Sequence, residues 1–312
     1  MGAGGYSHAT ALASWPGCTT PPSDRAMNIL SIQSWVAYGH VGNASAVFPL
    51  QRLGAEVHAI HTVQFSNHTG YGDWTGDVFR GEQVRALVDG IARRGALEQC
   101  DAVLSGYMGD AGIGYAILDA VARVRAANPR SLYCCDPVIG DDAHGIYVRP
   151  GIAELMRDAA IPAADIATPN AFELRQLTGL PDTTLAQAKQ AIAALQARMH
   201  PAGPRTVLLT SLRTDATPAD CLDMLVGEGE EFYLLRSPLL SVDLNGAGDA
   251  IAALFLFHRA MTGSALVALE AAGSAIYGVL RRTAEAGSRE LLSVAAQDEF
   301  VRPSVRLRAT PC

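Results

Sequence analysis

Residues 245–257 read Asn-Gly-Ala-Gly-Asp-Ala-Ile-Ala-Ala-Leu-Phe-Leu-Phe, a glycine-containing turn that runs directly into an apolar segment. Glycines at 246 and 248 let several backbone N–H groups converge on one anion where a helix begins. The carboxylate of Asp249 would stand beside that anion hole and could orient or deprotonate a hydroxyl group. Such a turn suits phosphoryl transfer to an alcohol. A simple glycine turn with Asp249 as a capping residue explains the same letters equally well.

On both sides of this turn, short apolar runs alternate with longer amphipathic segments. Strands are expected at residues 28–33, 57–64, 102–105, 132–135, 165–167, 206–210, 221–226 and 231–235. Helices are expected at residues 42–53, 83–94, 113–127, 170–178, 185–199, 249–261 and 265–282. This alternation is typical of βαβ units, which form a parallel sheet covered by helices on both faces. The predicted fold class is therefore α/β, with three layers around a central, mostly parallel sheet.

The chain of 312 residues has 49% hydrophobic and 18% charged residues, which is typical of a soluble globular protein. No Gly/Ser-rich linker follows residue 27, so residues 27–312 are predicted to form one domain. Residues 1–26 are rich in Gly, Ala, Ser, Thr and Pro and lack the pattern of a signal peptide. We interpret them as a disordered extension, or as the product of a start codon placed upstream of Met27.

The charged residues restrict the possible partners and chemistry. The net charge of −7 gives no broad basic surface for nucleic acid, and no apolar run is long enough to span a membrane. Lys189 is the only lysine, and no GxxxxGK[ST] run is present, so a P-loop lysine cannot hold nucleotide phosphates. The six cysteines show no metal-ligand spacing, which favours free thiols in a reducing cytoplasm.

Several polar residues lie at the ends of the expected strands, where ligands gather in open α/β sheets. Asp136 follows an apolar strand and precedes Pro137, so it suits Mg²⁺ bound directly or through water, although an Asp-Pro turn is equally ordinary. Asn170 and Glu173 have the spacing of a helix capping box, which alone could explain both residues. Other hydroxyl groups in such positions belong to Ser34, Thr168 and Thr210.

Two further segments resemble ligand-binding loops. Residues 62–72 are polar yet rich in aromatic and β-branched side chains, as expected of a recognition loop. Residues 140–145 are polar and flanked by glycine, and we interpret them as a mobile flap over a site.

Six motifs occur in one order along the chain: SIQSWVAYGHVGN, TVQFSNHTGYG, LSGYMGD, CDPVIGD, TPNAFEL and NGAGD. Together they resemble the pyridoxal kinases of the ribokinase-like superfamily, over roughly residues 27–297. The last motif and the DPV element are shared across that superfamily, whereas the first two are much more specific to pyridoxal kinases. The resemblance implies ATP-dependent phosphorylation of the 5′-hydroxyl of pyridoxal in vitamin B6 salvage, with Mg²⁺ and often K⁺, by a cytoplasmic homodimer.

The resemblance also implies roles for individual residues. Asp249 would be the catalytic base, with the backbone N–H groups of Gly246, Ala247 and Gly248 as the anion hole. Asp136 and Glu173 would manage Mg²⁺ and the ATP phosphates. The remaining residues of the nucleotide site would be Thr168, Thr210, Ser237, Pro238, Leu239 and Leu240. The substrate would be bound by Ser34, Thr69, Gly70, Val41 and Tyr107, together with Asp249.

This sequence departs from the family pattern at several positions. Trp35 follows the serine where relatives usually have a small or imidazole side chain, Thr210 replaces a lysine of some relatives, and Gly70 replaces a bulkier polar residue. The NGAG loop is closer to the form found in sugar kinases. Two alternatives therefore stand beside pyridoxal kinase: a kinase for a related alcohol such as hydroxymethylpyrimidine, and a weakly active vitamin B6-binding protein that serves homeostasis.

Overall fold

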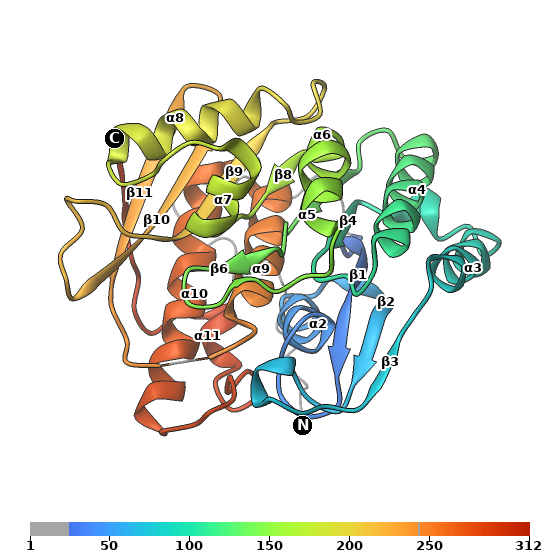
Figure 1. The fold of residues 1–312 in the computed structure, drawn as a ribbon, viewed down its shortest axis with the longest axis horizontal. Coiled ribbons are helices and arrows are strands. Elements are labelled where there is room, and N and C mark those ends of the chain that lie inside the picture. Colours follow the sequence, from blue (N-terminus) through green and yellow to red (C-terminus); the bar gives the residue numbers. More distant parts are fainter. Residues whose placement is uncertain (1–24, 243) are drawn as a thin grey trace, which may run out of the picture.

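A computed structural model describes residues 25–242 and 244–312. The predicted disorder of the N-terminal extension falls, for residues 1–24, outside the described part of the chain. The fold is a three-layer α/β/α arrangement around one large sheet (Figure 1). The strand order in this sheet is β12-β11-β10-β9-β8-β5-β4-β1-β2-β3. From β9 to β2 all neighbouring strands are parallel, whereas β3, β10, β11 and β12 pair antiparallel at the two edges.

The strands follow the expected apolar runs. The large sheet contains β1 (Asn28–Val36), β2 (Glu56–Phe65), β3 (Gly76–Val78), β4 (Ala102–Ser105), β5 (Leu132–Cys135), β8 (Ile166–Ala167), β9 (Thr206–Leu212), β10 (Cys221–Glu228), β11 (Glu231–Pro238) and β12 (Ala309–Pro311). A separate hairpin contains β6 (Gly140–Asp141) and β7 (Gly145–Ile146).

The helices connect these strands. They are α2 (Asn43–Arg52), α3 (Gly81–Ala92), α4 (Ala111–Ala127), α5 (Ile152–Leu155), α6 (Ile161–Ala163), α7 (Ala171–Thr178), α8 (Leu185–Gln196), α9 (Ala247–Thr262), α10 (Ala265–Glu285) and α11 (Asp298–Val301). Short 3-10 turns occur at η1 (Thr69–Tyr71) and η2 (Leu97–Gln99), and a π-helical turn, η3 (Met156–Ala160), joins α5 to α6.

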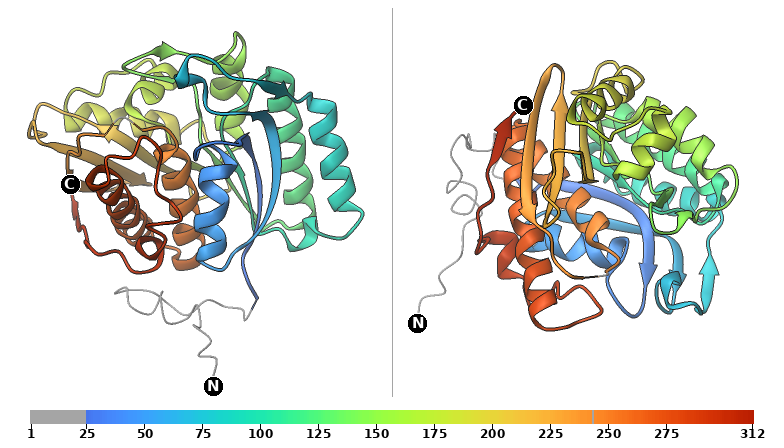
Figure 2. Two further views of the ribbon diagram at one scale, coloured as in Figure 1. Left: turned by 90° about the horizontal axis from the view of Figure 1, so that it is seen from below. Right: turned by 60° about the vertical axis from the view of Figure 1, so that its left-hand side comes forward.

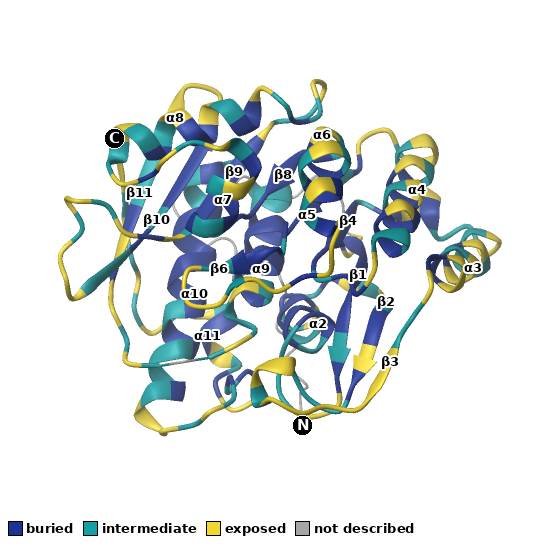
Figure 3. Cartoon of the chain, viewed as in Figure 1, coloured by how far each residue is buried: buried dark blue, intermediate teal, exposed yellow. Residues whose placement is uncertain are grey.

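Two apolar cores lie on opposite faces of the sheet, because successive strand residues point to opposite sides. In β1, Ile29 packs into the core beneath α2, α9 and α10, whereas Leu30 packs into the core beneath α3, α4, α7 and α8. Both side chains are essentially inaccessible to solvent. Figure 2 shows helices on both sides of the sheet, and Figure 3 shows the central strands and α9 buried. The two helical layers thus shield both faces of the central strands from water.

The expected strands and helices are all present, with bounds that differ by a few residues. Ser34 is expected to follow the first strand, but β1 continues through it to Val36. The sequence predictions miss β3, the β6–β7 hairpin, β12, the helical stretch from α5 to α6, α11 and the turns η1 and η2. Most of these are two- or three-residue elements, too short to show a periodic pattern. In the part of the chain that the structure describes, no helix has the length and hydrophobicity to cross a bilayer.

Candidate active site

The turn that opens α9 holds Asp249 in the first turn of a sixteen-residue helix. Gly246 precedes the helix with a φ of 88°, in the left-handed region that favours glycine. A Cβ atom at this position would overlap the carbonyl oxygen of His40, and the Ser45 hydroxyl donates to the Gly246 carbonyl at 2.7 Å. The loop between β1 and α2 and the first turn of α2 therefore hold the predicted anion hole from one side.

The residue Asp249 is half-buried, and its carboxyl group lies among protein atoms at the start of α9. Burial raises the pKa of Asp249 to about 6, against the backbone N–H groups of Gly42 and of Asp249 itself, which lower it. A pKa near the operating pH suits a general base, because the group is ionised yet still takes up a proton readily.

Asp136 directly follows β5, at the carboxyl end of a central strand. Its side chain is only 6% exposed, and its Oδ1 atom accepts a hydrogen bond of 2.9 Å from the Thr168 hydroxyl. Thr168 directly follows the neighbouring strand β8, so the parallel register brings the two side chains together. The carboxyl ends of β5 and β8 thus form the floor of the candidate site.

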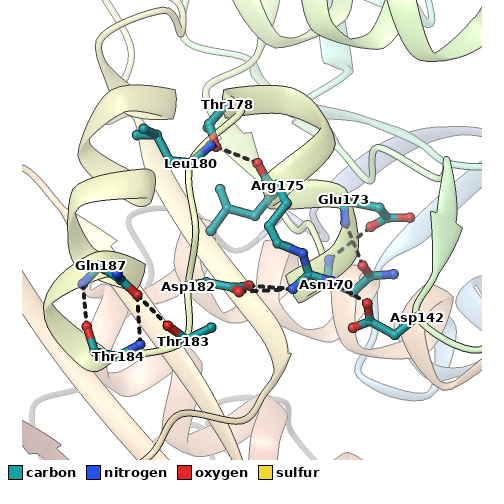
Figure 4. Close-up of polar contacts among 11 residues, drawn as sticks. Asp142, Asn170, Glu173, Arg175, Thr178, Leu180, Asp182, Thr183, Thr184 and Gln187 are labelled. Atoms are coloured by element: carbon teal, nitrogen blue, oxygen red, sulfur yellow. Dashed lines mark hydrogen bonds and ion pairs between the residues drawn. The ribbon is translucent and has the colours of Figure 1, made fainter.

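Glu173 lies in the first turn of α7, and its side chain is 3% exposed. Its Oε1 atom accepts the Ile139 N–H at 3.0 Å, and its Oε2 atom accepts the Asn170 N–H at 2.9 Å. The Asn170 side chain accepts the Glu173 N–H in return, which completes the expected capping box (Figure 4). Glu173 therefore caps the helix and also places a buried carboxylate at the strand ends.

The hairpin formed by β6 and β7 corresponds to the predicted flap and is tied to α7. The Asn170 side-chain amide donates to the Gly140 carbonyl at 2.9 Å. Arg175 bridges Asp142 of the hairpin and Asp182 beyond α7, as Figure 4 shows. These contacts hold the hairpin beside the carboxylates, while its mobility stays a prediction.

The three acidic residues share one electrostatic environment. Burial raises the pKa of Asp136 well above its usual range, and the charges of Glu173 and Asp249 raise it further. Burial also raises the pKa of Glu173 to about 8, although backbone N–H groups lower it. Carboxylates placed this close require protons or a cation to balance their charge.

This donor set fits Mg²⁺. Asp136 offers its Oδ2 atom, whereas both oxygens of Glu173 are occupied by backbone N–H groups. Among residues 25–242 and 244–312, no three His, Cys, Asp or Glu side chains are grouped to hold a metal directly. Mg²⁺ commonly keeps several waters and takes one or two carboxylates together with substrate phosphates, so a complete protein cage is not needed.

Besides Asp249, the residues expected at the substrate lie in β1 or in the segments that follow β1, β2 and β4. Ser34 is 6% exposed, and a Cβ atom on Gly42 would overlap both its carbonyl oxygen and its hydroxyl. Val41 and Tyr107 pack against one small apolar cluster formed by Val36, Val63 and Phe65. The Tyr107 carbonyl is fixed by the Thr62 hydroxyl at 2.8 Å.

Thr69 and Gly70 lie in the exposed turn η1. The preceding His68 places its Nδ1 atom 3.3 Å from the Asn245 side-chain nitrogen, and a Cβ on Gly70 would lie close to both side chains. The recognition loop predicted at residues 62–72 therefore meets the start of the anion-hole turn.

The remaining residues predicted to bind the nucleotide lie farther along the sheet. Thr210, within β9, donates its backbone N–H to the Pro169 carbonyl at 2.9 Å, so it borders the Thr168 turn. Ser237 and Pro238 end β11, and the Ser237 hydroxyl points back to the Leu222 carbonyl at 3.4 Å. Leu239 follows with 44% of its surface exposed, and Leu240 comes next.

Sequence reasoning misses one residue that joins this site from a distant part of the chain. Glu290 accepts a hydrogen bond of 2.5 Å from the Tyr71 hydroxyl, across 219 positions of sequence. It also accepts the His40 N–H at 3.3 Å. No motif surrounds Glu290, so only the fold brings it to attention.

Comparison with known proteins identifies the family of this chain. A family model described as phosphomethylpyrimidine kinase matches residues 82–292, more than half of the chain. The pyridoxal kinase of Granulibacter bethesdensis is 66% identical over 286 residues, which cover 92% of this chain and 100% of the relative. This chain belongs to the pyridoxal kinase family.

Other members of the pyridoxal kinase family agree over nearly the same length. The pyridoxal kinase of Deinococcus radiodurans is 57% identical over 278 residues, covering 88% of this chain and 93% of the relative. The structure of pyridoxal kinase from Leishmania donovani in complex with ADP and pyridoxine superposes with a TM-score of 0.83. It is 31% identical and covers 91% of this chain and 99% of its own. The predicted ribokinase-like fold and the predicted kinase family are confirmed.

The two family descriptions differ in coverage. The phosphomethylpyrimidine kinase match begins at residue 82, after the segments that contain Ser34 and Thr69. The matches to pyridoxal kinases cover about nine tenths of the chain. The segments that contain Ser34, Val41, Thr69 and Gly70 are thus outside the first match, whereas Tyr107 and Asp249 are inside it.

Proposed function

We propose that this protein transfers the γ-phosphoryl group of ATP to the 5′-hydroxyl of pyridoxal. The observation that carries the proposal is Asp249, a carboxylate with a pKa raised to about 6 at the start of α9. It stands between the buried carboxylates at the strand ends and the contact of Gly42 with Ser34 at the end of β1. The relatives named pyridoxal kinase match over about nine tenths of this chain, which supports pyridoxal as the acceptor.

In this proposal Asp249 aligns the hydroxyl and takes its proton late. A carboxyl group with a pKa of about 6 cannot ionise an alcohol beforehand, but a loose transition state demands little proton transfer early. The N–H groups of Gly246, Ala247 and Gly248 face the developing negative charge at the helix start. These groups replace the lysine that a P-loop would supply.

The other predicted residues complete the two binding regions. On the nucleotide side, Asp136 and Glu173 would hold Mg²⁺ directly or through water, and Mg²⁺ supplies positive charge against the phosphates. Thr168 and Thr210 border the same strand ends, with residues 237–240 beyond them. On the substrate side, Ser34 would bind the polar edge of the ring, between Val41, Tyr107 and the turn at Thr69 and Gly70.

The cellular context follows from the family. We propose a homodimer in the cytoplasm that uses MgATP, with K⁺ as the monovalent cation. Net charge and motif content point to small-molecule partners, with neither nucleic acid nor a membrane as a partner. Size-exclusion chromatography with light scattering, and assays with K⁺ replaced by Na⁺, test the dimer and the cation.

The experiment that tests the function is formation of pyridoxal 5′-phosphate by purified residues 27–312 with MgATP and pyridoxal, followed by absorbance. Hydroxymethylpyrimidine at matched concentrations is the competitor substrate. A higher kcat/KM for pyridoxal supports the proposal, and a higher value for the pyrimidine assigns the enzyme to the other branch. Tight pyridoxal binding with negligible turnover would instead indicate a homeostatic binding protein, the role that Trp35 and the missing lysine motivate.

A further inference from the structure

Glu290 is held firmly just beyond the end of α10. Its backbone N–H donates to the Ser288 hydroxyl at 3.1 Å, and that hydroxyl donates to the Glu290 carbonyl at 2.6 Å. The next residue, Leu291, is completely buried. The side chain of Glu290 is 15% exposed and extends towards the two loops on the substrate side of Asp249. Figure 1 shows the segment after α10 beside the turn at η1.

The two oxygens of this carboxylate serve different loops. Oε2 accepts the His40 N–H at 3.3 Å, in the loop between β1 and α2. Oε1 accepts the Tyr71 hydroxyl at 2.5 Å and lies 3.6 Å from Nε2 of His68, both in the loop after β2. The carboxylate of Glu290 thus bridges two segments that are separate in sequence. A Cβ atom on Gly39 would overlap the carboxylate, so the glycine permits the close approach.

Both loops contact the turn that contains Asp249. In one loop, Nδ1 of His68 lies 3.3 Å from the side-chain nitrogen of Asn245, the first residue of the NGAGD segment. In the other loop, the carbonyl oxygen of His40 packs against Gly246. The N–H of Gly42, two residues later, contacts the carboxylate of Asp249. A shift of either loop would therefore change the position of the anion hole relative to the substrate.

We propose that Glu290 is a positioning residue that ties the two substrate-side loops together and thereby sets where the substrate hydroxyl meets Asp249. This inference rests on the proposed phosphorylation of pyridoxal and adds a residue to the substrate side of that site. Glu290 touches neither the reacting atoms nor the nucleotide region, so its effect is on substrate placement.

The geometry makes glutamine an informative replacement. In Glu290→Gln, the negative charge is lost and one acceptor oxygen becomes an NH2 group, which cannot accept the His40 N–H and can only donate to the Tyr71 oxygen. The hydrogen bonds to a charged carboxylate thus become neutral ones, while the size and packing of the side chain are kept. Because charged acceptors form stronger hydrogen bonds than neutral ones, we expect kcat/KM for pyridoxal to fall about threefold to tenfold. KM for MgATP should stay within about twofold, because the nucleotide residues lie elsewhere.

Glu299→Gln is the matched control. Glu299 is a buried carboxylate of the same C-terminal region, 5% exposed, that accepts the Ser304 N–H at 2.7 Å and its hydroxyl at 2.8 Å. The Glu299→Gln change should lower the melting temperature, but it should not change KM for pyridoxal relative to KM for MgATP. Equal losses for pyridoxal and MgATP in Glu290→Gln, or no loss, would overturn the proposal.

Tyr71→Phe provides a second, milder test, because it removes only the hydroxyl that donates a hydrogen bond to Glu290. We expect a several-fold rise in KM for pyridoxal, and a combined Tyr71→Phe/Glu290→Gln variant that loses less than the sum of the two changes. If the combined variant loses the full sum of the two single losses, Tyr71 and Glu290 do not act through a shared contact. Dissociation constants for pyridoxal, measured without ATP, separate this inference from the proposed function. If wild-type protein binds pyridoxal without phosphorylating it, the function fails while weakened binding in both variants still supports the role of Glu290.

Discussion

The proposed nucleotide side and the proposed substrate side of the site are held by different kinds of contact. On the nucleotide side, Asp136, Thr168 and Glu173 are almost fully buried, and backbone groups or close neighbours in space fix their side chains. On the substrate side, Thr69 and Gly70 are exposed, and Glu290 reaches their loop across more than 200 positions of sequence.

This difference matches the two binding tasks. Phosphates and Mg²⁺ require fixed charges in a protected place, which strand ends and a helix cap provide. The ring of a small alcohol requires shape and a few polar contacts, which loops can change at little cost to the sheet. Changes on the nucleotide side should therefore affect phosphoryl transfer or ATP, and changes in the loops should affect pyridoxal alone.

The largest effect is expected at Asp249, which lies between the two sides. In Asp249→Asn the base is lost while the size of the side chain is kept, so kcat should fall by about 10²- to 10⁴-fold. The dissociation constant for pyridoxal should change little, because Asn still hydrogen-bonds the hydroxyl. Steady-state rates and equilibrium binding measure the two quantities, and a near-normal kcat would remove Asp249 from its assigned role.

The second effect is expected at Gly42, where the backbone of the substrate side approaches Ser34. Gly42 has a φ of 55°, and a Cβ atom there would overlap Ser34. Gly42→Ala should lower kcat/KM for pyridoxal by about 10- to 100-fold, since small displacements near the reacting groups are costly.

Gly72→Ala is the control for backbone strain. Gly72 has a φ of 93°, but nothing lies within 4 Å of an added Cβ atom. Both variants force alanine into a backbone conformation that L-residues rarely adopt, at a cost of about 1–3 kcal/mol, so both should have lower melting temperatures. If both also lose activity equally, strain and not the contact with Ser34 is the cause.

These two sides also differ in how far the sequence predicts them. Asp136 and Thr168 each follow a recognisable apolar strand, so the expected parallel pairing of those strands is enough to place them together. The capping box of Asn170 and Glu173 is equally local. Glu290 gives no such signal, because its partners Tyr71 and His40 lie more than 200 positions earlier in the sequence. Loop contacts between distant segments depend on the fold and leave no periodic pattern.

Edge strands escape prediction for a related reason. The segment that forms β3 and the segment that forms β12 contain three residues each, and their antiparallel pairing depends on neighbours already in place. In contrast, β4 and β5 are four-residue apolar runs buried between neighbouring strands, and their composition predicts their place.

The pH dependence of turnover should report the ionisation of Asp249. Because its pKa is raised to about 6, the carboxyl group is largely protonated below pH 6 and cannot accept the proton of the alcohol. We expect kcat/KM for pyridoxal to fall about tenfold per pH unit below the pKa and to level off above it. Rates measured between about pH 5 and pH 8.5 test this, and Asp249→Asn should lose the acidic limb. An acidic limb that persists in the variant belongs to another group.

The smallest effect is expected at Thr210, on the nucleotide side. Thr210→Lys would add a positive charge beside the Thr168 turn, where the phosphates are proposed to lie. Partly exposed charge pairs contribute about 0.2–1 kcal/mol, so KM for MgATP should fall only about twofold to fivefold, with pyridoxal unaffected. Thr210→Met adds similar length without charge and should show no gain, and salt should reduce the gain of the lysine variant. A lysine that changes KM for pyridoxal instead would mean that the two sides meet at Thr210, and that the separation between buried nucleotide contacts and adaptable substrate loops does not extend to this strand.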